Sequence, residues 1–239
     1  RVVLRGLGES GAQTISLAPE AGSERLRRLI NKGVAEKDIW EAVEGAAKEG
    51  IRQIKLYFMV GLPTEGDDDI DEMVKLALAL KRRIDGGGTG SQIVLTVAPF
   101  VPKAGTPFQR LAMAGAEVLS HRLSVIKNAL EPKGIGVKAE SVAWAVVQGV
   151  LSRGDARLAQ ALARMEGISL SSWRRALKDC SLEPEYYVNR YLSPSEGLPW
   201  SSLDSGIHPG YLELELEKAG HGEQTAPCPA VGCQECGVC

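Results

Sequence analysis

Two patterns of apolar and polar residues alternate along roughly the first 130 residues: short apolar runs, and longer segments in which apolar residues recur at helical spacing. Short, mostly apolar runs at 15–18, 54–60 and 93–98 predict strands. Segments in which apolar residues recur every three or four positions follow these runs, which is typical of amphipathic helices. Such helices are expected over 24–31, 36–49, about 67–83 and 116–130. Strands that alternate with helices pair in parallel, so the chain is predicted to be of the α/β class.

Local signals sharpen two of these elements. Ser23 has the right chemistry to cap the helix that follows it, and Gly33 suits the stop of that helix. The run 54–60 is interrupted by Lys55 but is otherwise nearly continuous. That composition is expected of a strand covered on both faces.

From about residue 140 the pattern changes to short helical segments with no evident strand. The expected helices lie at about 141–152, 156–166, 172–179, 184–191 and 209–219. We therefore expect an α/β part over 1–138, a helical extension over 139–222 and a cysteine-rich tail over 223–239.

Composition and charge narrow the class of protein. A formal charge of -2 gives no overall basic field that would attract nucleic acid. No apolar run approaches the roughly 18 residues that a membrane span needs. The chain opens on Arg1 without a methionine and without a signal peptide. We expect a cytoplasmic protein, no membrane partner, and a fragment of a longer chain.

The cysteines are unevenly placed. Cys180 stands alone, whereas Cys228, Cys233, Cys236 and Cys239 fall within the tail. Two successive Cys-x2-Cys steps resemble the ferredoxin run that holds a [4Fe-4S] cluster. Zinc accepts the same thiolate spacing and is the alternative. The tail therefore predicts a metal centre, with an iron–sulfur cluster favoured.

Two turns, 19–23 and 61–65, each close an apolar run and open a helix. The carboxyl ends of parallel strands meet at one edge of a sheet, where α/β proteins bind their ligands. A simpler interpretation is that these turns only cap helices, and that the loop after the third strand only closes the sheet. The candidate ligand-binding residues are Glu20, Gly22, Ser23, Gly61, Leu62, Pro63, Pro99 and Phe100.

The phrases at 18–27, 30–33 and 55–65, in this order and spacing, resemble radical SAM enzymes of the methylthiotransferase and Elongator-catalytic-subunit type. The likeness is closest to an uncharacterised branch that carries an N-terminal cobalamin-binding domain. The stretches 198–200 and 203–207 and the final Cys-Gly-Val-Cys resemble that branch too. The resemblance covers nearly the whole chain.

This resemblance implies the second half of a partial (β/α)6 radical SAM barrel, followed by the helical extension with its Cys-rich tail. In that family a [4Fe-4S] cluster on a Cys-x3-Cys-x2-Cys motif reduces S-adenosylmethionine to a 5'-deoxyadenosyl radical. The motif is absent here, because no cysteine precedes Cys180. The resemblance therefore implies an enzyme as the full-length protein and an inactive chain on its own.

The resemblance also implies positions for the cofactor. Glu20 would lie near the ribose or the amino-acid part of S-adenosylmethionine, and 61–65 would frame the adenine. Pro99 and Phe100 would form a wall of the site beside the adenine or a substrate. The implied partners are the missing N-terminal barrel half and cobalamin domain of the same protein, with tRNA or a protein as the substrate class. Two other functions stay open: a non-catalytic, metal-stapled binding module, and a zinc-ribbon RNA-binding protein.

Overall fold

The computed structural model describes residues 2–229, 232–233 and 235–238. The chain divides into two compact units, one formed by Arg1–Pro99 with Glu117–Glu140, the other by Phe100–Ala116 with Ser141–Cys239. The loop after the third strand therefore belongs with the C-terminal helices, whereas the helix after that loop belongs with the sheet. The finer division at residues 138 and 222 stays a prediction.

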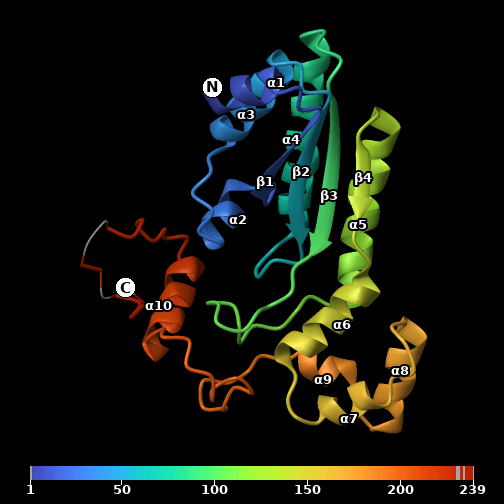
Figure 1. Ribbon diagram of the computed structural model, residues 1–239, viewed down its shortest axis with the longest axis vertical. Coiled ribbons are helices and arrows are strands. Elements are labelled where there is room, and N and C mark those ends of the chain that lie inside the picture. The colour runs from blue at the N-terminus through green and yellow to red at the C-terminus, as the bar shows by residue number, and fades with distance from the viewer. Residues whose placement is uncertain (1, 230–231, 234, 239) are drawn as a thin grey trace. The chain divides into compact units, whose positions relative to one another are not determined.

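The first unit alternates strands and helices (Figure 1). Its elements are α1 (Val2–Glu9), β1 (Thr14–Glu20), α2 (Glu24–Leu29), α3 (Glu36–Lys48), β2 (Gln53–Val60), α4 (Asp67–Gly86), β3 (Gln92–Pro99), α5 (Ala116–Leu130), a 3-10 turn (Glu131–Lys133) and β4 (Gly136–Ala139). The strands and helices expected from periodicity are confirmed, with α5 over its full predicted range.

The strands form a parallel four-stranded sheet in the order β1-β2-β3-β4. Parallel pairing was predicted for the first three strands and is confirmed. The fourth strand was missed, because β4 has only 4 residues, begins on Gly136 and contains no apolar run. Its register beside β3 is nevertheless regular, with Val137 paired to Leu95.

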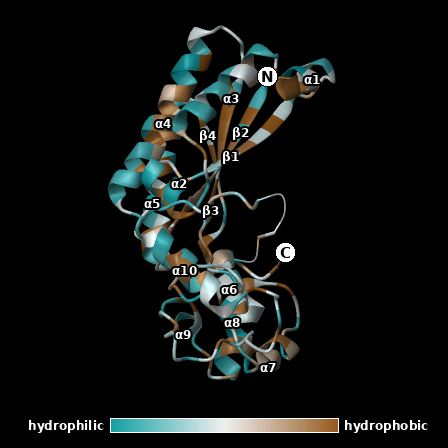
Figure 2. Ribbon diagram, turned by 90° about the vertical axis from the view of Figure 1, so that its left-hand side faces the viewer, coloured by the Kyte–Doolittle hydropathy of each residue, from teal (hydrophilic) through white to brown (hydrophobic). Residues whose placement is uncertain are grey.

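Only one face of the sheet is deeply buried within the described residues. Along β2, Ile54, Leu56, Phe58 and Val60 are buried, whereas the alternate positions are partly or fully exposed, with Tyr57 at 39%. Figure 2 shows α4 and α5 on the same side of the strands. The expectation of a strand covered on both faces is therefore wrong. Lys55 breaks the apolar run because it belongs to the face that the helices do not cover.

The second unit is helical. Its elements are α6 (Val142–Arg153), α7 (Leu158–Ala163), α8 (Leu170–Asp179), α9 (Pro184–Val188) and α10 (Pro209–Gly220), close to the predicted ranges. Helix α6 packs on α9, and α7 packs on α8. No helix in the described part of the chain is long and apolar enough to span a membrane.

Arg153, at the end of α6, connects the segments 109–111 and 187–190 of this unit. Its buried guanidinium donates to the carbonyl of Tyr187 at 2.6 Å and to that of Arg190 at 2.6 Å. It also donates to the carbonyls of Gln109 at 3.1 Å and Leu111 at 2.5 Å. Burial, with a smaller effect of the nearby Arg190 charge, lowers the pKa of Arg153 to about 10, so it stays charged at neutral pH.

Candidate functional site

A hydrogen-bonded network joins the turn after β1 to the turn after β2. Ser23 caps α2 by accepting from the Leu26 N–H at 3.2 Å, and its hydroxyl donates to Asp69 Oδ1 at 2.6 Å. Arg25 Nη2 donates to Asp69 Oδ2 at 2.5 Å, and its Nη1 donates to the Thr64 hydroxyl at 2.8 Å. The predicted capping role of Ser23 is confirmed, and the network fixes the two strand ends relative to each other.

Asp69 is the centre of this network and is buried. Burial alone would raise the pKa of its carboxyl. Hydrogen bonds from the Gly66 N–H, the Ser23 hydroxyl and Arg25 outweigh that effect and hold the pKa of Asp69 below its ordinary value. The carboxylate is therefore charged at neutral pH, and its negative charge complements the N-terminal end of α4.

Glu65 organises the turn after β2 from within. Its side chain is 1% exposed, and its two carboxylate oxygens accept from the N–H groups of Gly61 and Leu62, each at 3.1 Å. Arg122 of α5 donates Nη1 to Glu65 Oε1 at 3.0 Å and Nη2 to the Glu65 carbonyl at 2.7 Å. Burial raises the pKa of Glu65, and the two amides and Arg122 act in the opposite direction.

This arrangement changes what the turn can offer a ligand. The N–H groups of Gly61 and Leu62 are used inside the turn, and Leu62 is 3% exposed. Pro63 and Thr64 follow at the surface of the same turn, and Thr64 has a positive φ of 61°. A ligand at this edge would therefore meet Pro63 and Thr64, with no amide from Gly61 or Leu62.

Gly22 is explained by packing. A Cβ built on it would lie 2.5 Å from the Met73 nitrogen and closer still to the Met73 Cα, in the backbone of α4. The glycine lets helix α4 approach the first turn. The sequence also predicted that Gly22 lets the backbone approach a ligand, and that role stays a prediction.

Glu20 is the predicted residue with the most freedom to meet a ligand. It ends β1 after an irregularity in register and has a left-handed φ of 68°, which is uncommon for a non-glycine residue. Its side chain is 28% exposed and pairs with Lys32 Nζ at 3.3 Å. A carboxylate offers about four acceptor positions, so this single ion pair leaves capacity for further donors.

The basic residues of α2 and the segment after it are not a simple solvated face. Arg27 is 1% exposed and donates to the carbonyls of Ala21 and Gly22, at 3.1 and 2.7 Å, from beneath the turn. Arg25 belongs to the Asp69 network. Arg25 is nevertheless 52% exposed, so a solvated basic face, the simplest expectation for such a helix, fails here only for Arg27.

Pro99 and Phe100 follow the third strand as expected. Pro99 ends β3, is buried and is paired in register with Val60, next to the turn after β2. Phe100 begins the loop of the second unit, where its ring packs edge-on against Phe108 with centroids 5.8 Å apart.

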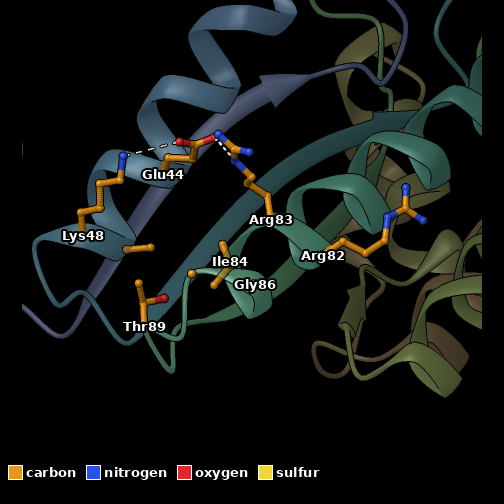
Figure 3. A pocket seen from close by; sticks show the side chains of 9 residues that line it. Glu44, Lys48, Arg82, Arg83, Ile84, Gly86 and Thr89 are labelled. Atoms are coloured by element: carbon orange, nitrogen blue, oxygen red, sulfur yellow. Dashed lines mark hydrogen bonds and ion pairs between the residues drawn. The ribbon is translucent and has the colours of Figure 1, made fainter.

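A separate hollow of about 430 Å³ lies at the opposite, amino edge of the sheet, between the ends of α3 and α4 (Figure 3). Glu44 in its lining binds Arg83 Nε at 2.6 Å and Lys48 Nζ at 3.7 Å. Parallel sheets bind ligands at the carboxyl edge, so we assign no function to this hollow.

The tail supplies three described thiols. Cys228 is exposed, Cys233 and Cys236 are partly exposed, and Cys239 lies outside the described residues. Within the described residues, no three His, Cys, Asp or Glu side chains come close enough to hold a metal ion. The Cys236 carbonyl accepts from the His208 N–H at 2.8 Å, so the tail folds back on the start of α10.

Sequence patterns missed the residues that hold the carboxyl edge together. Asp69 is one of three consecutive aspartates at the start of a helix, where a carboxylate needs no distant partner, and Arg122 gives no signal in the sequence. Their partners lie 46 and 57 residues away, at Ser23 and Glu65. Periodicity within one helix carries no information about such distant pairs.

Comparison with known proteins supports the expected superfamily, but no particular branch of it. The family model described as the radical SAM superfamily matches residues 1–77, which include both turns of the network. The chain is 38% identical over 151 residues to an uncharacterized protein of Methanocaldococcus jannaschii. The match covers 63% of this chain and 32% of that protein, so the chain spans about a third of the length of this curated relative. The parallel α/β sheet is consistent with part of a radical SAM barrel.

Proposed function

We propose that this chain contributes one wall of the S-adenosylmethionine site of a radical SAM enzyme. The observation that carries the proposal is the network that joins two successive strand ends at the carboxyl edge, inside the segment similar to the radical SAM superfamily. A [4Fe-4S] cluster bound to the full-length protein would supply the electron for reductive cleavage of S-adenosylmethionine. The first unit has no cysteine to hold that cluster, so its ligands must come from elsewhere.

Within this proposal the residues of the chain bind and orient. Glu20 accepts hydrogen bonds from the ribose hydroxyls or the α-ammonium group. The turn at Pro63 and Thr64 packs beside the adenine. Asp69 and Arg25 hold the two turns at a fixed separation, and Glu65 fixes the shape of the turn after β2.

The test is S-adenosylmethionine binding by the anaerobically reconstituted full-length protein, with formation of 5'-deoxyadenosine as a second readout. Glu20→Gln should weaken binding about tenfold, the typical effect of losing a charged hydrogen-bond partner. Glu24→Gln is the matched control, because Glu24 pairs on the surface with Arg28. Equal binding by both variants would remove Glu20 from the site. A wild-type protein that forms no 5'-deoxyadenosine would overturn the radical function and favour the binding module.

For the tail, we propose that Cys228, Cys233, Cys236 and Cys239 together hold an auxiliary [4Fe-4S] cluster, with zinc as the alternative. Support comes from the donor set, since thiolates at this spacing suit either metal. The described thiols do not form a closed site, so metal binding would have to draw the tail together. Metal analysis with an absorption spectrum distinguishes the two metals. Cys236→Ser should lower the metal content, whereas Cys180→Ser, outside the tail, should not.

Cobalamin is proposed as a second cofactor, held by an N-terminal domain of the same protein, on the strength of the family resemblance. The proposal also includes a tRNA or protein substrate in the cytoplasm. The corrinoid content of the full-length protein purified from its own cells tests the cofactor directly. A full-length protein without a corrinoid would contradict this part of the proposal.

A further inference from the structure

The second unit contains a cavity of about 580 Å³ that the radical chemistry does not use. Its walls come from the loop 104–110 and from the segment 194–213, both within that unit. Pockets for small molecules in proteins enclose about 300–1,000 Å³, so this one is large enough for a ligand of moderate size. Much of its lining falls in 198–207, a stretch that the sequence singled out without a function.

One wall of the cavity is apolar and carries an oriented indole. Trp200 donates its Nε1–H to Gln109 Oε1 at 2.9 Å, which fixes the ring and satisfies its polar atom. Leu203, Ile207 and Leu212 also line the cavity, and Leu203 is 74% exposed. An indole whose N–H is already bonded presents its apolar faces, and such faces stack on other aromatic rings.

A second part of the lining contains a guanidinium group, that of Arg110. Arg110 Nη1 donates to the carbonyls of Ser193 at 2.7 Å and Glu196 at 3.2 Å, which orient the guanidinium without neutralising it. The Glu196 carboxylate is engaged by Arg190 through two bonds of 2.7 Å. Arg190 lowers the pKa of Glu196, and Arg110 and Arg153 add smaller effects in the same direction. The charged residues of the lining are Arg110, Glu196 and Glu213, and of these Glu196 is paired with Arg190, which lies outside the lining.

We propose that this cavity binds a small molecule that joins an aromatic ring to an anionic group. The ring would stack on Trp200, and the carboxylate, phosphate or sulfonate would meet Arg110. This site is separate from the S-adenosylmethionine site proposed above and does not depend on it. Its ligand class follows from the Arg110 guanidinium, which is bonded to carbonyls rather than to a carboxylate, and from the fixed indole.

Two fluorescent probes test the proposal on the intact chain. 8-Anilinonaphthalene-1-sulfonate carries both an aromatic system and an anion, and N-phenyl-1-naphthylamine has the same rings without the sulfonate. The wild type should bind one equivalent of the anionic probe on the order of tenfold more tightly than the neutral one. Arg110→Met should abolish that preference, and Arg110→Lys should keep part of it, because lysine retains the charge.

The ring contact is tested separately. Trp200→Ala should weaken both probes about tenfold or more, as for a buried aromatic anchor. Trp200→Phe keeps a ring and should retain most of the binding, which leaves the test valid if the alanine variant does not fold. Trp144→Ala is the control, because Trp144 is 42% exposed on α6 and does not line the cavity. Equal affinity of the wild type for both probes, or equal effects of Trp200→Ala and Trp144→Ala, would refute the proposal.

Discussion

Replacement of Gly22 by alanine is the sharpest test of how the carboxyl edge is built. The φ of Gly22 lies outside the left-handed region, so alanine meets no backbone penalty there. Its Cβ would lie 2.5 Å from the Met73 nitrogen, about 1 Å inside the usual contact distance of about 3.5 Å. Relief requires α4 to move, and that movement would stretch the 2.6 Å bond between Ser23 and Asp69.

We expect Gly22→Ala to lower the free energy of unfolding by at least about 3 kcal/mol, the sum of overpacking and a damaged buried hydrogen bond. Urea unfolding of the chain measures this from the midpoint and slope. Gly86→Ala is the control, because a Cβ on Gly86 meets nothing within 4 Å and the residue ends helix α4. The control should be neutral or up to about 1 kcal/mol more stable. The Gly22→Ala variant could instead keep its stability to within about 1 kcal/mol and bind S-adenosylmethionine poorly. That result would show that the glycine serves the close approach of a ligand and not the packing of α4.

Three further perturbations test other parts of the structure. Arg122→Met should cost about 3 kcal/mol of stability in urea unfolding, because Glu65 loses a buried partner. Lys127→Met on the same helix should cost little, and equal losses would contradict the role of the pair. The folded-state pKa of Asp69 lies below its unfolded value of about 3.9, so its stabilisation is present above that pH and is lost as the pH falls through the folded pKa. Between pH 7 and pH 3, wild type should therefore lose more free energy of unfolding than Asp69→Asn, and parallel curves would show that Asp69 is not stabilised in this way. Arg153→Met should leave four carbonyls without their donor and speed hydrogen exchange in 109–111 and 187–190. Unchanged exchange there would mean that other contacts hold these loops.

The sequence predicted those features that depend on neighbouring residues. Helix α5 and the cap at Ser23 follow from spacing within one turn or one helix, and both are observed. Strand β4 was missed because its pairing with β3 compensates for a short segment rich in glycine. Lys55 was misread because an alternation of apolar and polar positions is hard to see when the partly exposed positions include Tyr57 and Met59.

The candidate site shows the same limit. The turns at Glu20 and Gly61 could be placed at one edge of a parallel sheet from topology alone. The partners that organise those turns could not, because Arg25, Asp69 and Arg122 act across long sequence separations. Whether a polar residue at a strand end is free for a ligand depends on such partners.

The two buried arginines have a consequence for sequence variation. Arg27 and Arg153 donate mainly to backbone carbonyls, which every amino acid provides. These bonds therefore place no requirement on the side chains of the residues that accept them, whereas the arginines themselves cannot become lysine, whose single nitrogen cannot reproduce the fork of donors. Contacts of this kind therefore produce no correlated substitutions between the arginine and the residues that accept its bonds. In an alignment of relatives, we expect invariant arginines facing variable loops, and methods that infer contacts from covariation would overlook the bonds that join them.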